Sequence, residues 1–245
     1  MKILLLDIET SPNTAHIWGL RDQYINPSHL LESSYVLCWA AKWYGKSEIM
    51  FNSVYKSNQE NMLKEIHDLL NEADTVVHYN GSRFDIPVLN KEFLLHNFKP
   101  CSSYKQIDLL RTMRKEFRFP SNKLDYIAQR LKLGKKTDHE GYTLWVKCMN
   151  GDPKSWKKME QYNKQDVVLL EKVYKKVLPW IKNHPNHNLF EGKGCPSCGS
   201  HRLTKQGFKH TTTGTYQRYQ CQDCGSWSKD TKALKKHSSI APEGG

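Results

Sequence analysis

Two carboxylates stand at the end of an apolar run close to the N-terminus, and their spacing favours metal chemistry. Residues 4–6 are leucines, and Asp7, Ile8 and Glu9 follow directly. This pattern is typical of a buried strand, in which Asp7 and Glu9 point to the same face because side chains alternate. Like charges so close repel strongly in a partly dry site, and a cation between them relieves the repulsion. The alternative interpretation is a strand that ends in a polar turn, with both side chains solvated.

Three more oxygen-bearing side chains far along the chain extend this set. Asp85 follows a second apolar run, residues 75–78, after a short turn. Tyr162 and Asp166 occupy positions i and i+4 of a segment with helical periodicity, so they project from one face. Four carboxylates and a phenol make the oxygen-rich environment that Mg²⁺ and Mn²⁺ prefer. Two such ions about 4 Å apart would clamp the attacking and leaving oxygens of a phosphodiester displacement.

The first two motifs resemble those of the DEDD exonuclease superfamily, whose members have a ribonuclease-H-like fold. Residues 7–9 match the first motif. Asn80, followed by Phe84 and Asp85, matches the second motif and is most similar to the proofreading domain of B-family DNA polymerases. The resemblance covers roughly residues 1–178 and implies an α/β fold with a mixed sheet flanked by helices.

The third motif resembles the tyrosine form of that superfamily (DEDDy), because Tyr162 stands four residues before Asp166. The histidine form needs a histidine five residues before the last aspartate, and that position is Gln161. The chain departs from the polymerases in its length, since 245 residues are too few for palm and fingers domains. The resemblance therefore implies a stand-alone nuclease, or one that works with a separate partner.

The resemblance implies a 3′–5′ exonuclease that uses two Mg²⁺ or Mn²⁺ ions on nucleic acid, with DNA favoured over RNA and single-stranded or frayed 3′ ends as substrate. Tyr162 would orient the attacking water, because a phenol with a pKa of about 10 is a poor base at neutral pH. The implied metal-binding residues are Asp7, Glu9, Asp85 and Asp166. The expected substrate-binding residues are Thr10, Asn80, Phe84, Lys135 and Lys136.

Two other functions remain open at this point. A ribonuclease-H-like endonuclease that cuts RNA or branched structures internally would use the same acids with a different groove. A nucleic-acid-binding scaffold without catalysis is expected to have lost one of the acids, whereas all four and the tyrosine are present. Bound metal separates the enzyme from the scaffold, since the enzyme predicts weak, exchangeable Mg²⁺ or Mn²⁺ sites beside one tight zinc, and the scaffold predicts zinc alone.

The charge of the chain points to an anionic partner. It has 37 Lys and Arg against 25 Asp and Glu, a formal net charge of +12, and nucleic acid is the usual partner of so basic a protein. No run reaches the ~20 apolar residues of a membrane helix. We expect the residues after Lys2 to form a strand and not a signal peptide. We therefore expect no membrane association and a cytoplasmic location, by analogy in a bacterial or phage-infected cell.

Two Cys-x₂-Cys pairs predict a second, small domain. Cys195 and Cys198 are separated from Cys221 and Cys224 by residues 199–220. Four thiolates at this spacing hold one structural Zn²⁺ in a zinc ribbon, with no position left for water. The ribbon surface favours nucleic-acid binding, and docking of a replication or repair protein is the alternative. We expect this surface to include Arg202, Lys205, Lys209, Tyr216, Arg218, Tyr219 and Trp227.

The predicted domains are a nuclease domain over residues 1–178, a linker over 179–194, the ribbon over 195–228 and a basic, disordered tail over 229–245. Periodicity predicts strands over residues 2–8, 16–20, 35–44, 48–51, 75–79 and 106–110, and helices over 83–96, 124–133 and 152–178.

Individual residues near these elements also receive predictions. We expect a Ser57–Glu60 capping box to open a helix that runs to Ala73, and Asp152 to cap the last helix. Asp108 is expected to have a structural or substrate-positioning role, and Trp39 to lie in the core with Trp43. The cations and rings of residues 111–119, including Arg114, fit either a nucleic-acid surface or an amphipathic helix.

Overall fold

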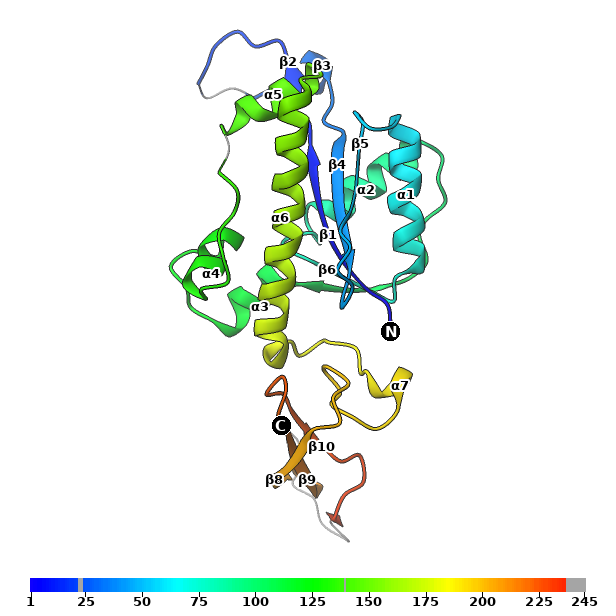
Figure 1. Cartoon of the computed structure of the whole chain (residues 1–245), viewed down its shortest axis with the longest axis vertical. Coiled ribbons are helices and arrows are strands. Elements are labelled where there is room, and N and C mark those ends of the chain that lie inside the picture. Colours follow the sequence, from blue (N-terminus) through cyan, green and yellow to red (C-terminus); the bar gives the residue numbers. More distant parts are fainter. Residues whose placement is uncertain (22–23, 139, 237–245) are drawn as a thin grey trace. The chain divides into compact units, whose positions relative to one another are not determined.

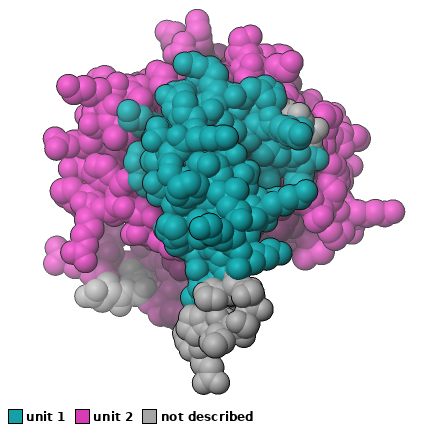
Figure 2. Space-filling view, turned by 90° about the horizontal axis from the view of Figure 1, so that it is seen from below, with its two compact units in different colours: residues 1, 174–245 teal, residues 2–173 magenta. Residues whose placement is uncertain are grey.

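The computed structural model describes residues 1–21, 24–138 and 140–236. The chain divides into two compact units, which Figure 2 colours separately. The larger unit is residues 2–173, and the smaller unit is residue 1 together with residues 174–245. Within the described ranges, no helix combines the length and the apolar character needed to cross a membrane.

A five-stranded mixed sheet forms the centre of the larger unit, in the order β5-β4-β1-β6-β7. The central strand β1 (Ile3–Thr10) pairs antiparallel with β4 (Val36–Trp43) and parallel with β6 (Thr75–His78). At the edges, β5 (Met50–Ser53) pairs antiparallel with β4, and β7 (Lys105–Asp108) pairs parallel with β6. The predicted α/β class with a mixed sheet is confirmed.

Helices cover both faces of this sheet. In Figure 1, α1 (Gln59–Glu72) and α2 (Asp85–Leu95) lie on one side of it, and the long helix α6 (Pro153–Val177) runs along the other. Residues of α6 up to 173 belong to this unit. The remaining helices are short: α3 (Leu109–Glu116), α4 (Leu124–Arg130) and α5 (Tyr142–Met149).

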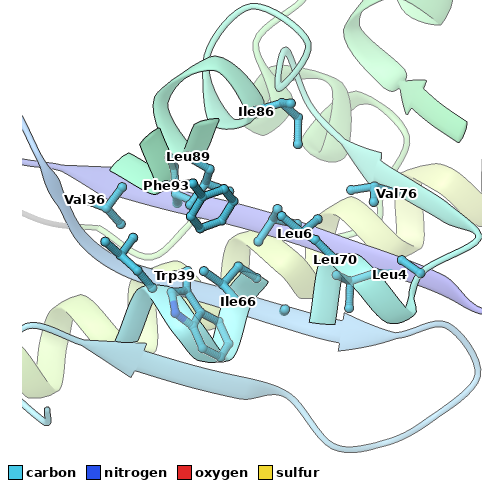
Figure 3. Close-up of a cluster of buried hydrophobic side chains, with 14 of the residues drawn as sticks. Leu4, Leu6, Val36, Trp39, Ile66, Leu70, Val76, Ile86, Leu89 and Phe93 are labelled. Atoms are coloured by element: carbon cyan, nitrogen blue, oxygen red, sulfur yellow. The ribbon is translucent and has the colours of Figure 1, made fainter. Parts of the chain in front are cut away.

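The core beneath α1 and α2 fixes the direction in which β1 faces (Figure 3). Leu4, Leu6 and Ile8 are buried there, in one cluster with apolar residues of both helices. Because side chains alternate along a strand, Asp7 and Glu9 must point to the opposite face, toward α6. Burial of the apolar face of β1 therefore determines the direction in which Asp7 and Glu9 point.

The two tryptophans of β4 pack as predicted. Trp39 is 2% exposed, and its indole Nε1 donates a hydrogen bond to the carbonyl oxygen of Met62 in α1 at 2.9 Å. Trp43 is partly buried against the same cluster. Both residues are thus part of the core, and they tie β4 to the layer of helices that covers it.

The strand predicted over residues 16–20 is wrong. The structure has only a two-residue strand, β2 (Thr14–Ala15), paired with β3 (Leu30–Glu32). Trp18 and Leu20 are 99% and 92% exposed, so this apolar stretch has no sheet to pack against. Apolar composition predicted a strand there, but a strand needs a partner with free hydrogen-bonding groups.

Two predictions about helix starts have different outcomes. The N-cap of α1 is Asn58, whose Oδ1 accepts a hydrogen bond from the backbone N–H three residues later, so the Ser57–Glu60 capping box is wrong by one residue. Asp152 accepts the backbone N–H of Ser155 at 2.9 Å, as expected for the cap of α6. The position of α6 matters because it carries the third motif.

Asp108 has a structural role, as predicted. Its Oδ1 accepts the backbone N–H groups of Leu110, at the start of α3, and of Asn80, in the turn after β6. Its Oδ2 accepts the hydroxyl of Ser82 at 2.6 Å. Both oxygens are engaged, so Asp108 holds the turn that leads into α2.

The smaller unit contains a β-sheet built on the hairpin of β8 (Leu203–His210) and β9 (Gly214–Cys221). The strands β10 (Trp227–Lys229) and β11 (Lys235–Lys236) both pair with β9. The prediction of a disordered tail from residue 229 is therefore wrong as far as Lys236, because β11 pairs with the edge of β9. Residues 237–245 of the predicted tail lie outside the described residues.

The predicted linker over residues 179–194 is also more structured than expected. It contains most of the 3₁₀ turn η2 (Leu178–Trp180) and the short helix α7 (Asn188–Glu191). His184 stacks on the rings of Tyr174 and His187, within the same unit. These contacts explain why the compact units divide near residue 174 and not at residue 178.

Candidate metal centres

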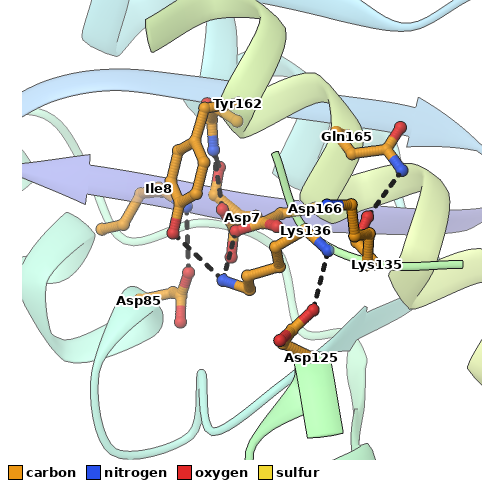
Figure 4. Close-up of polar contacts among 10 residues, drawn as sticks. Asp7, Ile8, Asp85, Asp125, Lys135, Lys136, Tyr162, Gln165 and Asp166 are labelled. Atoms are coloured by element: carbon orange, nitrogen blue, oxygen red, sulfur yellow. Dashed lines mark hydrogen bonds and ion pairs between the residues drawn. The ribbon is translucent and has the colours of Figure 1, made fainter. Parts of the chain in front are cut away.

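Three carboxylates from two distant parts of the sequence meet between β1 and α6, and Figure 4 shows two of them, Asp7 and Asp166. Asp7 and Glu9 come from β1 and Asp166 from α6, and each offers an oxygen within 4.8 Å of the others. Oxygens bound to one Mg²⁺ at about 2.1 Å lie at most about 4.2 Å apart. A small movement of the side chains would therefore bring all three onto one ion.

Burial makes these carboxylates hard to ionise together. It raises the pKa of Asp7 well above its ordinary value, and the charge of Asp166 raises it further. Burial raises the pKa of Glu9 to about 8, again with a contribution from Asp166. The pKa of Asp166 itself is raised by burial, although Lys136 opposes the change. Without a bound cation, the carboxyl groups of the cluster therefore remain protonated at higher pH than isolated carboxyl groups do.

Lys136 compensates part of this negative charge. Its Nζ lies 2.5 Å from Asp166 Oδ2 and donates to the Tyr162 hydroxyl at 3.1 Å. The backbone N–H of Lys136 donates to Asp125 Oδ1 at 2.8 Å, which holds the loop in place. Burial lowers the pKa of Lys136, but the charge of Asp166 raises it overall, so the ammonium stays protonated.

The cluster fits a divalent cation. Asp166 Oδ1 is buried and has no hydrogen-bond partner among the residues that the structure describes. A buried carboxylate oxygen without a partner costs free energy, which a cation can offset. Since the donors are all oxygens, Mg²⁺ or Mn²⁺ suits them better than a soft ion.

Sequence reasoning missed Asn163, which holds Asp7 in place. The Nδ2 of Asn163 donates to Asp7 Oδ2 at 2.7 Å and to the Asp7 carbonyl oxygen at 3.3 Å. Asn163 is fully buried on α6, directly after Tyr162. Its only sequence signal is that adjacency, because an asparagine on a helix has no distinctive spacing.

Asp85 lies beside the three-carboxylate cluster and outside it. It is the first residue of α2, where the helix N-terminus favours a negative charge. Its Oδ1 accepts the backbone N–H of Ile8 at 3.1 Å, which ties α2 to β1 between Asp7 and Glu9 (Figure 4). Burial raises the pKa of Asp85 to about 7.

The Tyr162 hydroxyl points toward Lys136, on the cluster side of α6 (Figure 4). The ring of Trp145 packs edge-on against Tyr162, with ring centroids 5.9 Å apart. Burial raises the pKa of Tyr162 above its ordinary value, with a further rise from Asp166. The phenol is therefore protonated at neutral pH and acts through hydrogen bonds, not as a base.

A cleft of about 670 Å³ opens onto these residues. Three cations, Arg114, Lys123 and Lys136, line it beside the carboxylate of Asp7. Arg114 thus faces the cleft. The sequence had not distinguished a nucleic-acid surface from an amphipathic helix for this segment. The complete lining is Asp7, Tyr79, Leu110, Arg114, Asn122, Lys123, Leu124, Asp125, Lys136 and Tyr162.

Of the five predicted substrate-binding residues, Lys136 belongs to this lining and the other four do not. Thr10 ends β1, where the register with β4 shifts. Asn80 has a φ of 71° and forms the turn before α2. Phe84 is 41% exposed, and Lys135 pairs with a nearby exposed aspartate at 3.0 Å. These four residues could contact substrate only outside this cleft.

A second cluster joins the four cysteines of the smaller unit. The sulfur atoms of Cys195, Cys198, Cys221 and Cys224 all lie within 4.8 Å of one another. The distance is 3.7 Å for both Cys195–Cys224 and Cys198–Cys221. Thiolates bound tetrahedrally to Zn²⁺ at about 2.3 Å are separated by about 3.8 Å, so the cluster fits zinc.

A glycine after each Cys-x₂-Cys pair closes the turn around the sulfurs. Gly199 and Gly225 both have a φ of 78°, a conformation that favours glycine. Their N–H groups donate to the carbonyl oxygens of Cys195 and Cys221 at 2.8 and 3.0 Å. These two turns therefore repeat the same geometry.

Zinc removal is expected to unfold the ribbon and spare the larger unit, because so small a sheet has little core of its own. The Cys195→Ser variant should bind almost no zinc and lose amide protection in β8 and β9, while β1 and β4 keep theirs. Hydrogen exchange and zinc content by mass spectrometry measure both. Cys101→Ser, outside the cluster, is the control and should retain zinc. Protected β8 and β9 in zinc-free protein would contradict this expectation.

The carboxylate cluster predicts that metal-free protein loses stability as the pH rises. The folded pKa values of Asp7, Glu9 and Asp85 are raised, so the folded state binds more protons than the unfolded state from about pH 4 to about pH 8. Stability therefore falls through this window. A loss of about 2 kcal/mol would lower the Tm by roughly 5 °C between pH 5 and pH 8.

Thermal melting without divalent metal measures this change. Mn²⁺ should restore the Tm at pH 8, and Asp7→Asn combined with Glu9→Gln should flatten the pH dependence. A Tm that rises from pH 5 to pH 8, or the same slope in that double variant, would show that other groups dominate.

The fold is similar to part of a known polymerase. The family B DNA polymerase from the hyperthermophilic archaeon Pyrobaculum calidifontis aligns with a TM-score of 0.55 and 17% sequence identity. The match covers 73% of this chain and 24% of the polymerase chain, so this chain spans about a quarter of that protein's length. At this identity the likeness concerns the fold. No curated protein matches the chain by sequence.

A family model described as the RNase_H superfamily (RNase_H_2) matches residues 32–178, more than half of the chain. The matched range contains Asp85, Tyr162 and Asp166, whereas β1 with Asp7 and Glu9 lies before it. The match agrees with the mixed sheet flanked by helices, and the four-cysteine cluster fits a zinc ribbon beside it. This chain therefore belongs to the ribonuclease H superfamily.

Proposed function

We propose that this protein is a nuclease of the DEDDy class that removes nucleotides from the 3′ ends of single-stranded or frayed nucleic acid, with DNA favoured over RNA. The observation that carries the proposal is the meeting of Asp7, Glu9 and Asp166 within 4.8 Å, at a cleft that Tyr162 also lines. Family membership supports a nuclease. The 3′–5′ direction of degradation is inferred from the resemblance of the three motifs to those of the DEDD exonucleases.

Asp7, Glu9 and Asp166 would hold a divalent ion, and Asp85 would support a second one nearby. Bound Mg²⁺ or Mn²⁺ ions supply an activated water and neutralise charge that develops on the phosphate. Asn163 keeps the Asp7 carboxylate turned toward the cluster through its 2.7 Å hydrogen bond. The chain thus provides preorganised ligands.

Tyr162 and Lys136 would position the reacting water and the phosphate. The Tyr162 hydroxyl is protonated, so it can hold a water by a hydrogen bond beside the carboxylates. Lys136 lies 3.1 Å from that hydroxyl and 2.5 Å from Asp166, within reach of a phosphate oxygen at the cluster. Its charge favours the same place for an anionic substrate.

The cleft would hold the strand that leads to the scissile bond. Arg114 and Lys123 stand along it, and the Tyr79 hydroxyl donates to the Asn122 carbonyl oxygen at 2.7 Å, which fixes one wall. Cations on a fixed wall favour a phosphate backbone over a neutral ligand. Replication or repair proteins that dock on the ribbon remain a separate prediction.

The proposal predicts that cleavage needs Asp7 and a free 3′ end. With 5′-labelled single-stranded DNA and Mn²⁺, the wild-type protein should give a descending ladder, and RNA should be degraded more slowly. Asp7→Asn should lower the rate on the order of 10³-fold, equivalent to about 4 kcal/mol of transition-state stabilisation. Tyr162→Phe should lower kcat roughly 10²-fold with little change in KM.

Asp68→Asn is the matched control, since Asp68 is exposed and its ion-pair partners, Lys64 and His67, lie with it on α1; its activity should be unchanged. Cuts that ignore a 3′ block would establish the endonuclease instead. Binding without cleavage in the wild-type protein would favour the scaffold. Full activity in Asp7→Asn would remove the basis of the proposal.

A further inference from the structure

One face of the ribbon sheet carries cations and aromatic rings side by side. Residues directly opposite each other in antiparallel strands share a face. Lys209 of β8 is opposite Tyr216, and Lys229 of β10 is opposite Arg218. Tyr216 and Arg218 are two residues apart on β9, so all four lie on one face. Trp227, two residues before Lys229, completes what we call the basic-aromatic face.

The cations of this face lie against its rings. The Arg218 guanidinium is 4.5 Å from the centre of the Trp227 ring, and Lys229 Nζ is 3.9 Å from the centre of the Tyr216 ring. Trp227 is 52% exposed, so much of its surface is available. A hollow of about 380 Å³ lies here, lined by Lys209, Arg218, Trp227, Ser228 and Lys229.

Within the described ribbon, residues 195–236, the acids do not neutralise this face. Asp223 pairs with Arg202 at 2.6 Å, away from the strands that form the face. Asp230 accepts the hydroxyl of Tyr219, which points to the opposite side of β9. Among the described residues, no ion pair involves the three cations of the face. Within residues 195–236, no ion pair therefore compensates its positive charge.

We propose that the basic-aromatic face binds single-stranded nucleic acid, as a second site separate from the carboxylate cleft. Unpaired bases would stack on Trp227 and Tyr216, and the neighbouring cations would contact the phosphates. A duplex hides its bases, so it should bind more weakly. Stacking and phosphate contacts do not read the sugar, so DNA and RNA should bind about equally.

The opposite face of the same sheet provides matched controls. Phe208 is opposite Gln217 and Lys205 is opposite Tyr219, so both point away from the basic-aromatic face. Phe208 is 51% exposed, almost the same as Trp227. An exposed apolar ring is the feature that a docking protein would use, so the two faces separate the two kinds of partner.

The test measures binding of a fluorescently labelled 20-nucleotide poly-dT by anisotropy, with zinc-loaded, full-length protein in an Asp7→Asn background that prevents cleavage. Trp227→Ala should weaken binding about tenfold. Lys229→Gln should weaken it about threefold and reduce the salt slope by roughly one. Phe208→Ala and Lys205→Gln should stay within about twofold. Poly-U RNA should behave like poly-dT, and blunt duplex should bind weakly and not respond to Trp227→Ala.

Each variant's zinc content is measured, and Lys229→Gln, an exposed change, keeps the test valid if Trp227→Ala loses zinc. Equal losses from Lys229→Gln and Lys205→Gln, or no loss from either, would overturn the proposal. Duplex binding that needs Trp227 as much as poly-dT does would also overturn it. The readout is binding, so the result does not depend on whether the carboxylate site is an exonuclease.

Discussion

Mutual repulsion among partly or fully buried carboxylates is the constraint on which the larger unit depends. Asp7, Glu9 and Asp166 are brought within 4.8 Å of one another in a place where burial raises their pKa values. Such a cluster works against folding unless the surrounding core is strong and a cation is at hand. The apolar side of β1 supplies the core, because the same alternation that buries Leu4 and Leu6 turns the acids outward.

The remaining contacts hold the opposing elements together around this charge. A nearly buried ion pair between Lys42 of β4 and Glu171 of α6 fixes the helix that carries Asp166 against the sheet. Lys136 brings a cation from a loop, and Asn163 fixes Asp7 without adding charge. One ammonium does not balance three carboxylates, which is the physical reason for expecting divalent ions at the site.

The five strands of the larger sheet and the principal acids could be predicted from sequence because their signals are local. Strand alternation placed Asp7 with Glu9, and helical spacing placed Tyr162 with Asp166. The position of Asp85 beside the cluster could not be predicted, because it depends on a hydrogen bond to Ile8 across two elements. Lys136 was expected to meet phosphate, but its pairing with Asp166 depends on how a loop folds back.

The arrangement of side chains on the ribbon sheet also could not be predicted from sequence. Six of the seven cations and rings expected on its surface divide between the two faces of the sheet, and the place of Lys209 depends on a register shift between Lys205 and Phe208. Gly207, with a φ of 64°, allows the irregularity. One residue more or less in the bulge would move Lys209 to the other face, and nothing in the spacing of lysines and aromatic residues reveals it.

The most direct measurement is a Mn²⁺ titration of zinc-loaded protein at pH 8, followed by calorimetry and by the electron paramagnetic resonance of free Mn²⁺. The carboxylate cluster predicts two weak, exchangeable Mn²⁺ ions per chain in the wild type and in Asp68→Asn, with loss of binding in Asp7→Asn. Equal Mn²⁺ binding by wild type and Asp7→Asn, or none by either, would contradict a metal-centred site at β1.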